Sequence, residues 1–263
     1  MHVQACELPI RVISTDFDGT LHDERESPPV PLRLQNLISR LQSQGAAWVI
    51  NTGRDLPSVL DALVHARLSI QPDFLVVAER EIYRRQGTAY TGIDPWNRDC
   101  RQAHEMLFAV MKADVPRLTA WVTEHFAATI YEDTFSPFCL LAGNNREADA
   151  IMEYLNEYCR QVPHLTIMRN DVYARFNHDA FNKGTALAEV ARLLGVSREQ
   201  VFAAGDHLND LPMLSADYAR CLVAPDNAVV AVKEAVRRQL GFVSGQPSGH
   251  GVAQGLEFFL GQK

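Results

Sequence analysis

Short apolar runs alternate with helix-like segments at both ends of this 263-residue chain. The runs just before Asp16, at 46–50 and at 74–78 predict strands, and the stretches between them repeat their apolar residues at helical spacing. The same alternation returns between residues 184 and 243. Strands that alternate with helices predict a parallel sheet, so we expect both ends of the chain to build one α/β fold, a doubly wound, Rossmann-like core.

The middle of the chain has a different sequence pattern, which predicts hairpins and longer helices in succession. We expect it to form a separate α+β domain inserted into the first one. The predicted boundaries are 1–81 and 179–263 for the core and 82–178 for the insertion. The predicted elements of the insertion are a hairpin at 81–93, helices at 101–111, 117–126 and 146–160, a strand at 138–142 and a hairpin at 166–176.

The composition narrows the class of protein. A net charge of −7 argues against a nucleic-acid partner, and no apolar stretch approaches the roughly 18 residues needed to cross a membrane. The N-terminus shows no secretory signal, and five widely spaced cysteines are most simply reduced thiols, which together predict a cytoplasmic protein. The sequence predicts no oligomeric state.

Two acids follow the first predicted strand in the string Asp16-Phe17-Asp18-Gly19-Thr20. Residues two apart at a strand end can turn both carboxylates to one side. One carboxylate could attack phosphorus, the other could act as a general acid and base, and both could hold a hard cation. Gly19 and Thr20 would let the backbone turn tightly and present N–H groups to an anion. An ordinary Asp-Gly turn is the competing interpretation.

Three further segments carry residues suited to phosphate and metal binding. Thr52, Gly53 and Arg54 end the second predicted strand, and Lys183 begins a helix, where an anion is favoured. Lysine is scarce in this chain, with 4 against 21 arginines, and the P-loop pattern is not met around it.

The third segment, Gly205-Asp206-His207-Leu208-Asn209-Asp210, offers oxygen ligands of the kind Mg²⁺ prefers, although Asp and Asn also cap helices. A helix is expected around 210–215. Ser248, in a Pro- and Gly-rich stretch that lacks the G-x-S-x-G pattern, is expected to lie in a loop. No histidine pair has the H-x-x-x-H spacing typical of zinc sites.

Taken together and in this order, these four segments resemble the haloacid dehalogenase superfamily. The resemblance implies that Asp16 is the nucleophile, Asp18 the general acid and base, and Thr52 and Lys183 the groups that hold phosphoryl oxygens. It further implies a Mg²⁺ site at Asp16, Asp18 and Asp206. Asn209 or Asp210 would complete that shell, and the predicted phosphate contacts also include Gly19, Gly53, Arg54 and Asn209.

The position of the insertion, between Thr52 and Lys183, resembles the Cof-type and sucrose-phosphate-phosphatase-like group with a C2 cap. This implies a phosphatase that hydrolyses a small phosphorylated metabolite, a sugar phosphate being the expected class, through an aspartyl-phosphate. A C2-capped phosphomutase and a non-catalytic phosphate-binding module are the alternatives. The segment Glu79-Arg80-Glu81 follows the third predicted strand, where many members of that group have Asn-Gly, and this departure leaves the substrate open. Arg54, Glu79, Arg80 and His207 are candidates for the rim of the substrate site.

Overall fold

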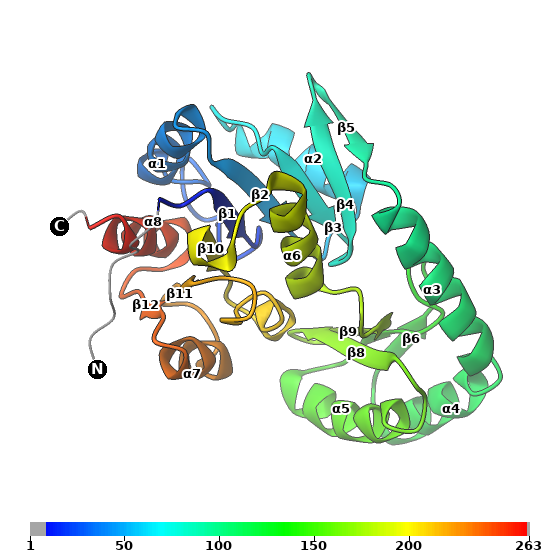
Figure 1. Cartoon of the computed structure of the whole chain (residues 1–263). Coiled ribbons are helices and arrows are strands. Elements are labelled where there is room, and N and C mark those ends of the chain that lie inside the picture. Colours follow the sequence, from blue (N-terminus) through cyan, green and yellow to red (C-terminus); the bar gives the residue numbers. More distant parts are fainter. Residues whose placement is uncertain (1–8, 262–263) are drawn as a thin grey trace. The chain divides into compact units, whose positions relative to one another are not determined.

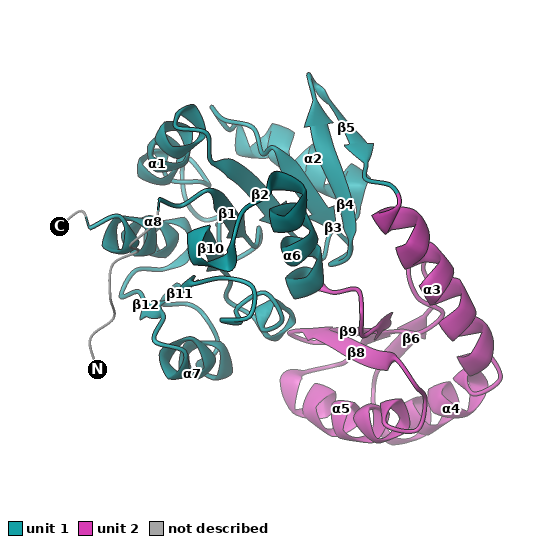
Figure 2. Cartoon of the chain, in the orientation of Figure 1, with its two compact units in different colours: residues 1–94, 183–263 teal, residues 95–182 magenta. Residues whose placement is uncertain are grey.

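The computed structural model describes residues 9–261, which form two compact units. Unit 1 contains the chain up to residue 94 and again from residue 183, and unit 2 contains residues 95–182 (Figure 2). The first eight residues, part of the segment in which no secretory signal was predicted, lie outside the described residues. Within the described range, every helix is too short or too polar to span a membrane.

Unit 1 is built on an eight-stranded sheet with the order β12-β11-β10-β1-β2-β3-β4-β5 (Figure 1). The strands from β12 to β3 are all paired in parallel, as the alternation predicted. The strands are β1 (Val12–Thr15), β2 (Ala47–Asn51), β3 (Phe74–Val77), β4 (Glu81–Gln86), β5 (Ala89–Gly92), β10 (Val201–Ala204), β11 (Cys221–Ala224) and β12 (Phe242–Val243). The chain order reverses beside β1, and such a switch point is where open α/β sheets bind ligands.

Helices cover this sheet on both faces. The helices of unit 1 are α1 (Leu32–Ser43), α2 (Leu56–Ala66), α6 (Lys183–Leu194), α7 (Val230–Arg238) and α8 (Ser248–Phe259), with short 3₁₀ turns η1 (Arg198–Gln200) and η2 (Leu208–Asp210). One buried cluster joins α1, α2 and α8 to the strands through residues such as Ile38, Ile13 and Leu256. Helices α6 and α7 contact the sheet outside that cluster, which completes the doubly wound arrangement.

The hairpin at 81–93 belongs to unit 1, so the predicted boundary at residue 82 is wrong. Its first strand, β4, pairs antiparallel with β3, and β5 pairs with β4, which extends the main sheet by two strands. The change in sequence pattern at this point suggested a new domain, but backbone pairing of β4 with β3 across a tight turn keeps the hairpin in the main sheet. Unit 2 therefore begins at Pro95 and ends at Asn182 rather than at residue 178.

Unit 2 is an α+β domain, as predicted, with its own four-stranded antiparallel sheet in the order β6-β7-β9-β8. Its core gathers Phe138, Ile151 and Phe176 with other apolar side chains from both the helices and the sheet. The elements are α3 (Trp96–Met111), α4 (Val115–His125), β6 (Thr129–Tyr131), β7 (Cys139–Leu141), α5 (Asn145–Cys159), β8 (Leu165–Asn170) and β9 (Tyr173–His178). Strand β6 was not predicted, because three residues carry too little periodicity.

Two predictions near the C-terminus were wrong. Ser248 is the first residue of the helix α8, not part of a loop. The glycines that lower helix propensity there allow close packing: a Cβ at Gly255 would lie 2.5 Å from a methyl carbon of Val223 in β11. The helix expected at 210–215 is reduced to the single turn η2 followed by irregular turns, because the side chain of Asp210 is engaged inside the unit.

Candidate active site

Three charged side chains from separate segments meet at the carboxyl end of β1. Asp16 follows β1, Lys183 is the first residue of α6, and Asp210 is the last residue of η2. The Nζ of Lys183 donates hydrogen bonds to Oδ1 of Asp16 at 2.6 Å and to Oδ1 of Asp210 at 2.7 Å. All three side chains are buried. The fold brings Asp16 and Lys183, which are 167 positions apart, together with Asp210 into one ion-paired cluster.

The opposite charges of this cluster stabilise one another. Burial opposes the charged form of Lys183, but the carboxylates of Asp16 and Asp210 more than offset it and raise the pKa of the ammonium. Burial also raises the pKa of Asp16, while Lys183 acts to lower it. A buried ammonium in direct contact with two carboxylates is best satisfied when both are ionised, so we assign Asp16 as a carboxylate.

Asp206 lies beside this cluster at the end of β10. Its Oδ1 accepts a 2.6 Å hydrogen bond from Oγ1 of Thr20, and its Oδ2 accepts one from Nδ2 of Asn227 at 3.3 Å. Burial, and then the nearby charge of Asp210, raise the pKa of Asp206 to about 7. One carboxylate oxygen from each of Asp16, Asp206 and Asp210 lies within 4.8 Å of the others, a spacing that a metal ion could bridge.

Both carboxylate oxygens of Asp210 accept hydrogen bonds from other residues of the protein. Besides Lys183 at Oδ1, it accepts at Oδ2 the backbone N–H groups of Asp206 at 2.9 Å and His207 at 3.0 Å. Gly205 allows this close approach, because a Cβ there would lie 2.6 Å from Cγ of Asp210. Asp210 therefore holds Lys183 and the Asp206 loop in place, and both of its oxygens are occupied.

Gly19 provides the tight turn that follows Asp16 and Asp18. Its φ is +76°, a conformation that favours glycine, and a Cβ there would lie 2.6 Å from Oδ2 of Asp206. We expect Gly19→Ala to displace the Asp206 carboxylate and to lower kcat/KM for a phosphate ester at least about tenfold, which corresponds to about 1.4 kcal/mol. Steady-state kinetics at several Mg²⁺ concentrations would measure this loss.

Gly87 offers a matched control for that substitution. It also has a positive φ, +64°, but a Cβ there would meet no atom within 4 Å. Gly87→Ala should therefore cost a similar backbone strain of about 1 kcal/mol and leave the kinetics unchanged. Equal kinetic losses in the two variants would mean that Gly19 matters only for folding.

Asp18 forms a bidentate ion pair with Arg54. The Nε and an Nη of Arg54 donate to the two oxygens of Asp18, each at 2.7 Å. The guanidinium also lies over the ring of Phe17, 5.6 Å from its centre. The Asp18 side chain is 45% exposed, in contrast to Asp16, so it is open to a proton donor or acceptor from solvent.

The remaining predicted phosphate contacts follow β2. Thr52 is buried, and its Oγ1 accepts a hydrogen bond from the backbone N–H of Arg54 at 3.2 Å. Gly53 is exposed, and a Cβ there would lie 3.5 Å from Oε1 of Glu79. Thr52 thus shapes the loop that carries Arg54, and the two residues lie in unit 1 with the Asp16 cluster.

Asn209 contacts Glu79, a pairing that the sequence did not predict. The Nδ2 of Asn209 donates to Oε1 of Glu79 at 2.9 Å, and both residues are buried. Thr20 and Asn227 hold Asp206; Thr20 was predicted only as a backbone donor to an anion, and Asn227 was not predicted as a site residue. Thr20 lies in the first acidic motif, but Asn227 is 21 residues beyond Asp206 and only the folded chain brings it there.

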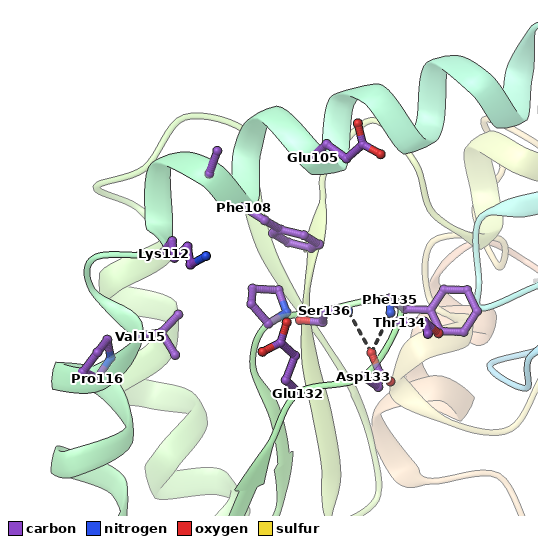
Figure 3. A pocket seen from close by; sticks show the side chains of 12 residues that line it. Glu105, Phe108, Lys112, Val115, Pro116, Glu132, Asp133, Thr134, Phe135 and Ser136 are labelled. Carbon is purple, nitrogen blue, oxygen red and sulfur yellow. Dashed lines mark hydrogen bonds between the residues drawn. The ribbon is translucent and has the colours of Figure 1, made fainter.

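Unit 2 contains a pocket of about 570 Å³, and no residue that lines it was singled out in the sequence (Figure 3). Phe108 and Phe135 give it aromatic surface, and the carboxylates of Glu105 and Glu132 give it acidic groups. The Oδ1 of Asp133 fixes its loop by accepting the N–H groups of Phe135 and Ser136. Lys112 adds a cation to the lining, so the pocket combines aromatic surface with groups of both charges.

Comparison with known proteins identifies similar sequences over most of the chain. Residues 13–77 and 116–256 match the family described as haloacid dehalogenase-like hydrolases. The protein YxeH of Bacillus subtilis, which bears a provisional phosphatase name, is 37% identical over 94% of this chain and 97% of its own. The 5-amino-6-(5-phospho-D-ribitylamino)uracil phosphatase YcsE of the same organism is 28% identical over 89% of this chain and 91% of its own.

Solved structures share the fold. The sucrose-phosphatase of Synechocystis, solved with sucrose and phosphate, has a TM-score of 0.71 at 16% identity and covers 96% of this chain and 98% of its own. A haloacid dehalogenase-like hydrolase from Bacillus subtilis has a TM-score of 0.63 at 20% identity and covers 94% and 99%. At these identities the likeness concerns the fold alone, which matches the predicted core with an insertion.

Proposed function

Because the chain belongs to the haloacid dehalogenase-like hydrolases, we propose that it is a Mg²⁺-dependent phosphatase that uses Asp16 as its nucleophile. The observation that carries this proposal is the buried contact of Asp16 with Lys183, beside the carboxylate of Asp206. A carboxylate held rigidly by a buried cation is preorganised for attack, and the same cation can meet a phosphoryl oxygen. Unit 2 would be the C2-type cap of this enzyme.

The proposed reaction has two displacements. In the first, the Asp16 carboxylate forms a bond to phosphorus, the bond from phosphorus to the ester oxygen breaks, and Asp18 gives its proton to the leaving oxygen. In the second, Asp18 takes a proton from water, the water oxygen attacks phosphorus, and the bond to Asp16 breaks. Lys183 and the loop of Thr52 and Arg54 would hold the phosphoryl oxygens throughout.

The residues present fit a divalent cation. Asp16 and Asp206 offer carboxylate oxygens close together, and the Asp18 backbone carbonyl would add a third ligand as the family resemblance implies. A further sign is Oδ1 of Asn209, a buried acceptor with no hydrogen-bond partner among residues 9–261. Orphaned acceptors of this kind often mark the place of an ion or its water. When bound, Mg²⁺ would neutralise charge on the phosphate and the carboxylates.

We propose a sugar or polyol phosphate as the substrate class. The name of YcsE describes a phosphate ester on a ribityl chain, and the sucrose-phosphatase acts on a sugar phosphate by its name.

A substrate panel tests the function. Phosphate release would be measured from p-nitrophenyl phosphate, hexose and pentose phosphates and nucleoside monophosphates, with Mg²⁺ and with EDTA. We expect turnover that depends on Mg²⁺, with kcat/KM at least about tenfold higher for a sugar phosphate than for the nucleotides. Isomeric hexose phosphates without free phosphate would instead identify a phosphomutase. Binding without any turnover would identify a non-catalytic module.

A further inference from the structure

The turn after β3 has an unusual backbone for its sequence. Ala78 and Glu79 have φ angles of +48° and +68°, and the N–H of Arg80 donates to the carbonyl of Val77 at 3.0 Å. Two consecutive positive φ angles are those of a hairpin turn that normally takes Asn-Gly. Residues other than glycine and asparagine are retained in such positions where the surrounding structure fixes them, and these positions cluster at functional sites.

The turn is fixed to the loop that carries the predicted phosphate contacts. The N–H of Ala78 donates to the carbonyl of Arg54 at 2.8 Å, and the N–H of Glu79 donates to the carbonyl of Thr52 at 2.9 Å. These two bonds set the direction in which the side chain of Glu79 leaves the backbone. Glu79 is only 4% exposed, and its charge acts on the ammonium of Lys183.

Glu79 determines which end of the Asn209 amide is engaged in a hydrogen bond. The Nδ2 of Asn209 donates to Oε1 of Glu79 at 2.9 Å, so the NH₂ end of the amide is the end that Glu79 holds. Oδ1 is then the end that has no partner among the described residues 9–261. An oxygen acceptor cannot bind a phosphate oxygen, but it can contact a cation or a water molecule bound to one.

The neighbouring acid, Asp210, has no carboxylate oxygen left for contact with a cation. Asp210 already accepts three hydrogen bonds on its two oxygens, from Lys183, Asp206 and His207. Asn209 is therefore the residue of this segment, after Asp206, with an oxygen to offer. Of the two roles predicted for Asn209, this favours an acceptor in the metal shell over a donor to phosphate.

We propose that Glu79 is a positioning residue that holds Asn209 with its Oδ1 available to the coordination shell of a divalent cation at Asp16 and Asp206. The cation is of the hard, oxygen-preferring class, and Asn209 meets it directly or through a coordinated water. The inference rests on the proposed function, because it needs the cation that the phosphatase would use. It adds a residue outside the four motif segments, Glu79, which lies in the turn after β3.

Glu79→Gln is the test variant. Glutamine keeps the size of the side chain but carries both a donor and an acceptor, so Asn209 can pair with it in either orientation. We expect Mg²⁺ affinity, measured by calorimetry on the metal-free full-length protein, to fall about tenfold, as is typical when a partner of a metal-binding residue is changed. At saturating Mg²⁺, kcat should return to near the wild-type value. Circular dichroism and thermal unfolding would verify the fold.

Two further variants separate positioning from a structural effect. The double variant Glu79→Gln with Asn209→Asp reverses the polarity of the pair, since glutamine can donate to aspartate, and should regain Mg²⁺ affinity. Glu81→Gln removes the same charge two residues away, where Oε2 of Glu81 accepts from the hydroxyl of Tyr83. This control should bind Mg²⁺ as the wild type does.

The outcomes distinguish this inference from the function itself. Unchanged Mg²⁺ affinity in Glu79→Gln overturns the inference alone, whatever the kinetics. A loss of kcat that excess Mg²⁺ does not restore also overturns it, because Glu79 would then act on the substrate. A wild-type protein that binds no Mg²⁺ in calorimetry overturns the inference together with the proposed function.

Discussion

Asp16→Asn is expected to lower phosphate release by about 10³-fold or more, because it removes the nucleophile of the proposed reaction. The amide cannot attack phosphorus to form an acyl phosphate. Its Oδ1 can still accept the hydrogen bond from Lys183 that the carboxylate accepts at 2.6 Å, so the fold should remain intact. Single-turnover kinetics with p-nitrophenyl phosphate, together with thermal unfolding, would measure both quantities.

Asp61→Asn is the control for that substitution. Asp61 is exposed on α2 and takes no part in the Asp16 cluster, so activity should not change. If Asp16→Asn and the wild type release phosphate at the same rate, covalent catalysis by Asp16 is wrong. If Asp16→Asn fails to fold, trapping the wild-type enzyme with substrate and identifying the phosphorylated residue by mass spectrometry would test the nucleophile directly.

Lys183→Met is expected to have the largest effect on stability. The substitution leaves two buried carboxylates, on Asp16 and Asp210, without the ammonium that now contacts both. Removal of one partner from a buried ion pair costs about 3–5 kcal/mol, because the remaining charge stays desolvated. Denaturant unfolding at neutral pH without metal would measure the loss, and activity should fall as well, since Lys183 would hold a phosphoryl oxygen.

Lys233→Met provides the comparison on the surface. Lys233 on α7 pairs with Asp226 at 3.3 Å, and the Asp226 side chain is 60% exposed. Such a surface pair contributes less than about 1 kcal/mol, so this variant should unfold almost as the wild type does. A similar small loss for Lys183→Met would contradict the view that the cluster is held together by its central cation.

The sequence alone predicted the class of fold and the segments proposed to carry the catalytic residues. Strand and helix periods differ enough that the alternation at the two ends of the chain identified a parallel sheet. Asp16, Thr52, Lys183 and Asp206 were found because each follows a strand or begins a helix at the edge where parallel strands end. That reasoning needs only local patterns and the connectivity rules of α/β folds.

Local patterns failed where packing decided the outcome. The hairpin at 81–93 has the texture of the insertion, yet its hydrogen bonds to β3 make it part of unit 1. Helix α8 contains several glycines, and its contact with Val223 explains why they are tolerated. In both cases a contact between elements outweighs the local sequence pattern.

The roles of individual oxygens also required the tertiary structure. The sequence left Asn209 and Asp210 as equal candidates for the metal shell, because both offer oxygen ligands. Only the folded chain engages both oxygens of Asp210 and turns the amide of Asn209 toward Glu79, a residue 130 positions away. The sequence thus determined the fold class and the segments in which we propose the chemistry to lie. The tertiary structure decided what each carboxylate and amide contacts, because hydrogen-bond partners depend on distances that no sequence spacing fixes.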